Sequence, residues 1–297
     1  MSEHKANLFV VGAMKAGTTT FMEQLALHKE IYVSPIKEPH FFVDKLPINL
    51  YEPSRFFDED HYFEKEFPAP LHICKLESAE HYKTLFSMRR NESILAEGST
   101  AYLHAPEAAE KIHRYNANAR IIILLRDPLK RAHSHYQMDL GKGRVKDAFE
   151  TVVSREIERY ETASLEWNSY IGMSSYDSTV ARYRSLFQQV LVLKFEDWIG
   201  DQEKALETVA EFLEVGAFPS RESAHRNASR SLRFQKVFYF LKQLGLKDYF
   251  SKVFGTKFKQ WLFRKVSSDK KVAIKLSPDT AEKLSSIFTK ESGTCYY

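Results

Sequence analysis

The chain has 297 residues, of which 43% are hydrophobic and 28% are charged, and its formal net charge is +4. This mixture is typical of a globular protein with a sizeable core, and it excludes disordered, collagen-like and coiled-coil chains. No apolar run approaches the roughly 20 residues that cross a bilayer, and the N-terminus lacks a signal peptide's apolar stretch, so we expect a cytoplasmic protein. Because only two cysteines are present, we expect no disulfide framework.

Four short apolar runs alternate with helical patterns along the chain. Such runs, bounded by turn or cap residues, are typical of buried parallel strands. Their alternation with helices predicts an α/β fold, in which helices cover both faces of one open, central parallel sheet. The predicted strands are Leu8–Val11, Ile94–Ala96, Ile121–Leu125 and Val190–Phe195.

Cap residues mark the ends of the predicted helices. Residues 160–185 also read as helical, and the aromatic segment 44–90 reads as an insertion that covers one edge of the sheet. We expect a single domain over residues 1–297, with an α/β core over 1–220 and a basic, aromatic part over 221–297 that covers the cleft. The other predicted helices begin at Thr18 or Thr19, at Pro128 after Asp127, and after Asp201, and they end near His28, Asp139 and Leu213, with Gly216 just past the last.

The first predicted strand runs directly into a loop rich in glycine, lysine and threonine, Gly12–Thr20. A loop of this kind between a strand and a helix aims backbone N–H groups and a helix N-terminus at one point, which makes an anion site. Lys15 adds a positive charge and the threonines add hydroxyl donors. The sequence therefore predicts a phosphate site.

The loop departs from the pattern of nucleoside-triphosphate loops, G-x-x-x-x-G-K-[ST]. Gly12 and Gly17 fit that pattern, but Thr18 stands in place of the lysine, which is found at position 15 instead. Asp127 follows a strand but precedes Pro128, which suits a helix cap better than a Mg²⁺ ligand. A P-loop nucleotide kinase or phosphotransferase, and a catalytically inactive phosphonucleotide-binding module, are therefore the alternatives to the interpretation that follows.

Two segments together resemble the sulfotransferases that use 3′-phosphoadenylyl sulfate (PAPS) as the donor. Residues 15–20 resemble the family's 5′-phosphosulfate loop. The strand that ends in Arg126, followed by Ser134 eight residues later, resembles its 3′-phosphate motif. The carbohydrate and heparan-sulfate branch of the family is the most similar. Residues 37–42 resemble its catalytic segment, and residues 96–102 resemble the segment that lines its acceptor cleft. Residues 192–197 resemble a later strand and helix, and residues 227–229 resemble the segment before the loop that covers the cofactor.

The resemblance implies a role for each matched residue, and it implies no metal. Lys15 would neutralise the 5′-phosphate and the bridging oxygen during in-line displacement, and Arg126 with Ser134 would hold the 3′-phosphate. The residues implied in PAPS binding are Lys15, Ala16, Gly17, Thr18, Thr19, Thr20, Arg126, Ser134 and Arg230.

Glu38 and His40 are the candidates for the base that takes the acceptor's proton. Glu38 matches the family's catalytic carboxylate, whereas an imidazole such as that of His40 gains and loses protons near neutral pH. Their i, i+2 spacing puts both side chains on one face if the segment is extended. Which of the two is the base stays open at this point.

The C-terminal third is strongly basic, with fifteen Lys and Arg against three Asp and Glu from Arg221 to Lys275. Such asymmetry predicts an anionic partner. Because the family resemblance implies an anionic partner other than nucleic acid, we do not expect nucleic acid to bind. We expect the acceptor to be a carbohydrate, a glycolipid or a small metabolite that has a hydroxyl or an amine. The basic segment would grip an anionic acceptor or lie peripherally on an anionic membrane surface.

Overall fold

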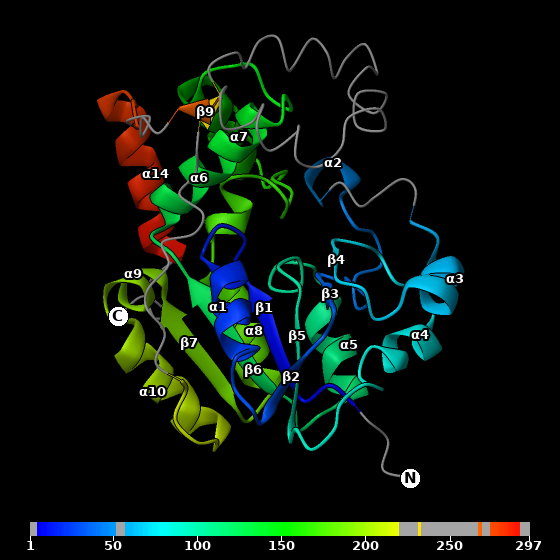
Figure 1. Cartoon of the computed structure of the whole chain (residues 1–297). Coiled ribbons are helices and arrows are strands. Elements are labelled where there is room, and N and C mark those ends of the chain that lie inside the picture. The colour runs from blue at the N-terminus through cyan, green and yellow to red at the C-terminus, as the bar shows by residue number, and fades with distance from the viewer. Residues whose placement is uncertain (1–4, 52–56, 220–230, 233–266, 269–273, 292–297) are drawn as a thin grey trace. The chain divides into compact units, whose positions relative to one another are not determined.

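The computed structural model describes residues 5–51, 57–219, 231–232, 267–268 and 274–291 (Figure 1). The chain forms two compact units. In the described residues, the first comprises the chain up to 127 with 175–219 and 289–291, and the second comprises 128–174 with 231–232, 267–268 and 274–288. The predicted division near residue 220 falls outside the described residues and stays a prediction.

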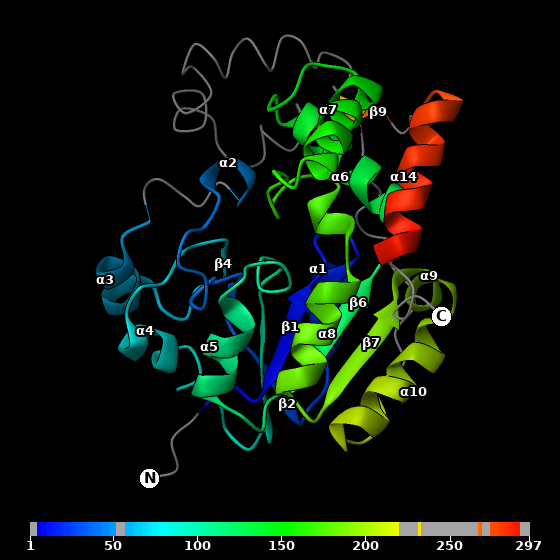
Figure 2. The ribbon, with the colours of Figure 1, turned by 180° about the vertical axis from the view of Figure 1, so that it is seen from behind.

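A five-stranded parallel sheet forms the centre of the first unit, in the order β2-β5-β1-β6-β7 (Figures 1 and 2). All four predicted strands are present, which confirms the α/β fold class. The fifth strand, β2, does not follow from the sequence pattern, because three residues are too few to display a period. The strands are β1 (Leu8–Gly12), β2 (Ile31–Val33), β5 (Ile94–Gly98), β6 (Arg120–Leu125) and β7 (Val190–Lys194).

Helices cover both faces of this sheet. One helix, α1, lies on the face turned to the viewer in Figure 1, and α5 and α8 lie on the opposite face, which Figure 2 presents. With both faces covered, β1 is buried along its whole length and β6 along all but its first residue. The helices of this unit beside the sheet are α1 (Thr18–Leu25), α5 (Ala108–Tyr115), α8 (Asp177–Leu186), α9 (Phe195–Gly200) and α10 (Gln202–Leu213).

Two helix ends differ from the sequence prediction. The residue at the N-cap of α1 is Gly17 rather than a threonine, because the chain enters the helix through a left-handed turn with a φ of 80°. Asp201 caps α10 as predicted, since its side chain accepts a hydrogen bond from the amide of Lys204 at 3.1 Å. At the other end of α10, however, the left-handed residue is Glu214 and not Gly216.

Residues 160–185 are predicted to be helical, but they are α-helical only at their two ends. Two helices, α7 (Phe149–Glu161) and α8, are separated by a connection that contains a 3-10 turn at Gly172–Ser174. Glu156 of α7 accepts hydrogen bonds from the amides of Tyr170 at 3.0 Å and Ile171 at 2.8 Å. A carboxylate from another element thus satisfies amides that a continuous helix would have paired with its own carbonyls.

Short elements over residues 36–84 lie beside β2, the edge strand of the sheet. The hydroxyl of Tyr32 in β2 donates to the carbonyl of Leu85 at 2.9 Å. This arrangement agrees with the predicted insertion over one sheet edge. The elements are β3 (Ile36–Lys37) and β4 (Leu71–His72), which pair in parallel, with α2 (Ile48–Tyr51), α3 (Glu59–His61), a π-helical turn (Tyr62–Glu66) and α4 (Ala79–Thr84).

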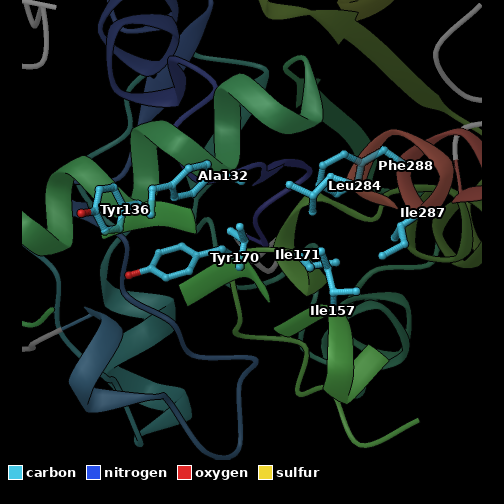
Figure 3. Close-up of a cluster of buried hydrophobic side chains, with 10 residues drawn as sticks. Ala132, Tyr136, Ile157, Tyr170, Ile171, Leu284, Ile287 and Phe288 are labelled. Atoms are coloured by element: carbon cyan, nitrogen blue, oxygen red, sulfur yellow. The ribbon is translucent and has the colours of Figure 1, made fainter. Parts of the chain in front are cut away.

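In its described residues, the second unit is built on the helices α6 (Pro128–Gly141), α7 and α14 (Pro278–Glu291). The start of α6 at Pro128 is as predicted. Apolar side chains from all three helices form one buried cluster, which includes Ala132, Ile157 and Leu284 (Figure 3). The C-terminal helix α14 therefore shares a core with α6 and α7.

Polar contacts also fix the start of α14. Glu150 of α7 accepts hydrogen bonds from the amide of Ser277 at 2.8 Å and from the hydroxyl of Thr280 at 2.7 Å. A small antiparallel pair, β8 (Ser231–Leu232) with β9 (Ser267–Ser268), completes the described part of the chain. None of the helices that the structure describes is both long enough and apolar enough to cross a membrane.

Candidate active site

Three loops meet at the carboxyl edge of the sheet, where β5, β1 and β6 end. Parallel strands send their following loops to the same edge, which is the usual place for a ligand site in an α/β sheet. The amide of Glu38 donates to the carbonyl of Gly98 at 3.1 Å, and the amide of Ser99 donates to the carbonyl of Val10 at 3.2 Å. Backbone hydrogen bonds therefore join the Glu38 segment to the end of β5, and the residue after β5 to β1.

The phosphate loop, Gly12–Thr20, connects β1 to α1 at this edge. Lys15 and Gly17 both have left-handed backbones, with φ values of 73° and 80°. A Cβ atom on Gly17 would lie 2.9 Å from the ring of Phe195, so only glycine fits both the turn and the packing. The loop presents the N-terminus of α1, a suitable place for an anion. Of the predicted binding residues, Lys15, Ala16 and Gly17 form the turn, and Thr18, Thr19 and Thr20 form the first turn of α1.

Arg126, directly after β6, lies against the phosphate loop. Its Nη1 donates a hydrogen bond to the carbonyl of Lys15 at 3.1 Å. Its guanidinium carbon lies 4.7 Å from the centre of the Phe195 ring, the same ring that packs over Gly17. The structure thus brings Arg126, one residue of the second predicted anion-binding motif, to the phosphate loop, although 111 residues separate Arg126 from Lys15.

Glu38 and His40 also lie together, but not because their segment is extended. Both residues have left-handed backbones, with φ values of 60° and 49°, so the extended geometry considered for their i, i+2 spacing does not apply. This turn brings Nε2 of His40 to 3.3 Å from Oε2 of Glu38. The hydroxyl of Thr100 donates to the same carboxylate oxygen at 3.0 Å, and Nζ of Lys37 lies 3.7 Å from the other oxygen.

The ionisation of Glu38 follows from these contacts. Burial alone would raise the pKa of its carboxyl, which is only 7% exposed. The hydrogen bond and charge of His40, the charge of Lys37 and the hydroxyl of Thr100 outweigh burial and lower the pKa of Glu38 to about 2. Glu38 is therefore ionised at neutral pH and is able to accept a proton, which His40 lies close enough to share.

Two further residues of the predicted donor site lie elsewhere in the chain. Ser134 is a buried residue of α6, in the second unit. Arg230 lies outside the described residues. The roles of both residues in binding the donor stay predictions.

Sequence reasoning missed two residues of this site, Thr100 and Phe195. Thr100 belongs to the segment 96–102, but its bond to Glu38 joins residues 62 positions apart and leaves no local pattern. Phe195 is predicted as the last residue of a strand, whereas it begins α9 and its ring contacts both Gly17 and Arg126. Its position just after a strand could have indicated a place at the site, because residues that follow parallel strands lie at the carboxyl edge of the sheet.

Comparison with known proteins decides the family. The sequence pattern of the sulfotransferase family matches residues 7–219, which include the phosphate loop, Glu38, His40, Arg126 and Ser134. The chain belongs to the sulfotransferase family. The crystal structure of a sulfotransferase from Alicyclobacillus acidocaldarius matches the fold of this family member with a TM-score of 0.63 and 24% identity, over 97% of this chain and 93% of that one.

Two curated sulfotransferases are similar in sequence. Carbohydrate sulfotransferase 15 from Homo sapiens is 24% identical over 257 residues, which cover 73% of this chain and 45% of that protein. Heparan sulfate glucosamine 3-O-sulfotransferase 5 from Homo sapiens is 25% identical over 235 residues, which cover 77% of this chain and 60% of that protein. The chain thus spans about half the length of these relatives.

Arg126→Ala tests the donor side of this sulfotransferase. We expect the substitution to weaken the binding of adenosine 3′,5′-bisphosphate by about 2–4 kcal/mol, the range for removing one partner of a hydrogen-bonded charge pair. The value of kcat at saturating donor should change far less, because the 3′-phosphate is remote from the transferred group. Isothermal titration calorimetry measures the affinity. An unchanged Kd would mean that Arg126 does not bind the donor and only donates a hydrogen bond to the carbonyl of Lys15.

Proposed function

We propose that this chain transfers the sulfuryl group of PAPS by in-line displacement to a hydroxyl or an amine of a carbohydrate, glycolipid or small-metabolite acceptor. The observation that carries the proposal is the hydrogen bond between Arg126 and the carbonyl of Lys15. It joins, at one sheet edge, the two motifs that the family resemblance assigns to the two phosphate groups of the donor. The buried pair of Glu38 and His40 is held by backbone hydrogen bonds at the same edge.

The residues at this edge fit the donor's charges. Lys15 and the amides at the N-terminus of α1 suit the 5′-phosphosulfate, since both favour an anion. The planar guanidinium of Arg126 has five N–H donors and can bind a phosphate by a fork of two. Ser134 and Arg230 would add contacts to the donor, as the resemblance implies. PAPS, when bound, supplies a sulfuryl group on a phosphate leaving group.

Glu38 and Lys15 have complementary tasks in the proposed transfer. The acceptor's oxygen or nitrogen forms a bond to sulfur while the bond from sulfur to the bridging phosphate oxygen breaks. Glu38 takes the proton that the acceptor loses, and His40 shares it across the 3.3 Å that separates the two side chains. Lys15 stabilises the negative charge that develops on the bridging oxygen.

Calorimetry with two nucleotides separates this function from its alternatives. We expect adenosine 3′,5′-bisphosphate to bind and ATP with Mg²⁺ to bind weakly, because the lysine at position 15 and not at position 18 departs from the triphosphate pattern. Binding of ATP with Mg²⁺ and none of the bisphosphate would instead indicate a phosphotransferase. Binding of the bisphosphate without any transfer would indicate an inactive binding module.

The acceptor class rests on the relatives, whose names specify carbohydrate and heparan sulfate glucosamine as acceptors. A carbohydrate acceptor is therefore the first to test. The predicted grip of the basic segment on an anionic acceptor or on a membrane surface concerns residues that lie mostly outside the described ones. That grip and the cytoplasmic location stay predictions.

A further inference from the structure

A second carboxyl group, that of Glu97, lies buried behind the pair of Glu38 and His40. Glu97 is in β5 and is fully buried. Its Oε1 accepts a hydrogen bond from the hydroxyl of Ser99 at 2.6 Å. Its Oε2 accepts from the hydroxyls of Tyr82 at 2.8 Å and Tyr102 at 3.3 Å. Three hydroxyl groups therefore donate to one carboxylate, which satisfies its acceptors without a cation.

Two of these hydroxyl groups in turn hold the backbone that carries the candidate base. The oxygen of Ser99 accepts a hydrogen bond from the amide of His40 at 3.2 Å. The oxygen of Tyr102 accepts from the amide of Phe42 at 3.4 Å. Since each hydroxyl has one proton, giving that proton to Glu97 leaves its lone pairs aimed at the amides. Glu97 thus orients the two hydroxyl groups so that their oxygens accept hydrogen bonds from the amides of His40 and Phe42.

The backbone at this place needs such support. A left-handed conformation at a residue other than glycine is strained and persists only when the surroundings hold it. Glu38 and His40 both have this conformation. Backbone bonds also hold the segment, among them those from the amide of Glu38 to Gly98, from Cys74 to Glu38 and from Leu76 to Pro39, but the amides of His40 and Phe42 donate to the two hydroxyls.

We propose that Glu97 is a positioning residue for the transfer reaction, which acts through the hydroxyls of Ser99 and Tyr102 to keep Glu38 and His40 in their reactive turn. The inference rests on the proposed function, in which the pair of Glu38 and His40 takes the acceptor's proton. Glu97 itself is fully buried and touches neither donor nor acceptor. Loss of its contacts should therefore lower kcat without weakening the binding of the donor.

The ionisation of Glu97 supports this role. Burial raises the pKa of its carboxyl to about 7, the three hydroxyl hydrogen bonds offset part of this rise, and the charge of Glu38 adds to it. The other titratable groups near Glu97 include Cys74, Tyr82, Tyr102 and Tyr183, whose pKa values are all raised by burial, and His40 lies beyond Ser99. Glu97 loses its proton as the pH rises through about 7, and the carboxylate then accepts hydrogen bonds most strongly.

A matched pair of variants tests the inference. Ser99→Ala and Tyr82→Phe each remove one hydroxyl donor to Glu97. Only Ser99 also accepts the amide of His40, whereas Tyr82→Phe keeps the ring that stacks on Phe41 with 4.4 Å between ring centroids. Misplacing a reacting group by about 1 Å can cost roughly 10²-fold in rate, so we expect Ser99→Ala to lower kcat by about 10- to 100-fold. Tyr82→Phe should keep kcat near the wild-type value.

Three measurements are made on both variants above the pKa of Glu97. These are kcat, the Kd of adenosine 3′,5′-bisphosphate, and amide hydrogen exchange in a peptide that contains residues 38–43. We expect Ser99→Ala alone to lower kcat and to speed this exchange, with Kd unchanged in both. If Ser99→Ala fails to fold, Glu97→Gln, which keeps the shape of the side chain, provides the same comparison against Tyr82→Phe.

The outcomes separate this inference from the proposed function. Equal effects on kcat in the two variants, or slower turnover without faster exchange, would overturn the positioning role of Glu97. Retention of wild-type kcat by Ser99→Ala, while Glu38→Gln is inactive, would also overturn it and leave the proposed function standing. Full activity of Glu38→Gln and His40→Ala would instead refute the proposed proton acceptors themselves.

Discussion

Lys15→Ala is expected to lower kcat by about 10²- to 10³-fold, the cost of removing one group that stabilises a developing negative charge in the transition state. The ammonium group of Lys15 interacts most strongly when charge builds on the bridging oxygen as the bond to sulfur breaks. In the ground state the amides at the N-terminus of α1 continue to hold the phosphate. The Kd of adenosine 3′,5′-bisphosphate should therefore rise much less than kcat falls.

Steady-state kinetics and calorimetry on the same preparation measure this difference. Lys29→Ala is the matched control, because it removes the same charge from an exposed position beyond the other end of α1 and should leave both quantities unchanged. A raised KM with an unchanged kcat in Lys15→Ala would mean that Lys15 only binds the donor.

Glu38→Gln is expected to lower kcat by about 10²-fold or more, because the amide keeps the shape of the side chain but cannot take the acceptor's proton. The affinity for adenosine 3′,5′-bisphosphate should not change, since Arg126 and the phosphate loop are intact. The decisive comparison is with His40→Ala. Substantial activity in Glu38→Gln, together with its loss in His40→Ala, would assign the proton acceptor to His40.

The pH dependence of kcat adds an independent check on this assignment. Because the pKa of Glu38 is lowered to about 2, its carboxylate stays ionised as the pH falls and is lost only in strong acid. A decline of kcat between neutral pH and about pH 5 therefore reports another group, such as Glu97, whose pKa is raised to about 7, rather than protonation of Glu38. If kcat of the wild type declines in that range and only the Glu38→Gln variant lacks the decline, the lowered pKa of Glu38 is contradicted.

The phosphate loop and Arg126 could be predicted from the sequence because each follows a continuous apolar run that is typical of a buried strand. β1 and β6 are recognisable runs, and the residues after parallel strands necessarily share one edge of the sheet. The pairing of the two motifs therefore followed from topology. The hydrogen bond from Arg126 to the carbonyl of Lys15 agrees with the expectation that these two segments lie together.

Other features depend on contacts between distant residues, which a local pattern does not contain. Hydroxyls some 60 residues away accept from the amides of His40 and Phe42 at the left-handed turn, and the local i, i+2 spacing does not reveal this turn. The break in the predicted helix over 160–185 depends on Glu156, which takes up two backbone amides from the connection. Tertiary hydrogen bonds overrode local propensity at both places.

Transfer of radiolabelled sulfate from PAPS tests the central claim most directly. The wild-type chain and Lys15→Ala are incubated with labelled PAPS and a panel of carbohydrate, glycolipid and small-molecule acceptors, and the label in each acceptor is counted. We predict that the wild type labels at least one acceptor and releases an equal amount of adenosine 3′,5′-bisphosphate, while Lys15→Ala labels it at least about 10²-fold more slowly. Tight binding of the bisphosphate with no label in any acceptor would contradict the account and indicate a binding protein.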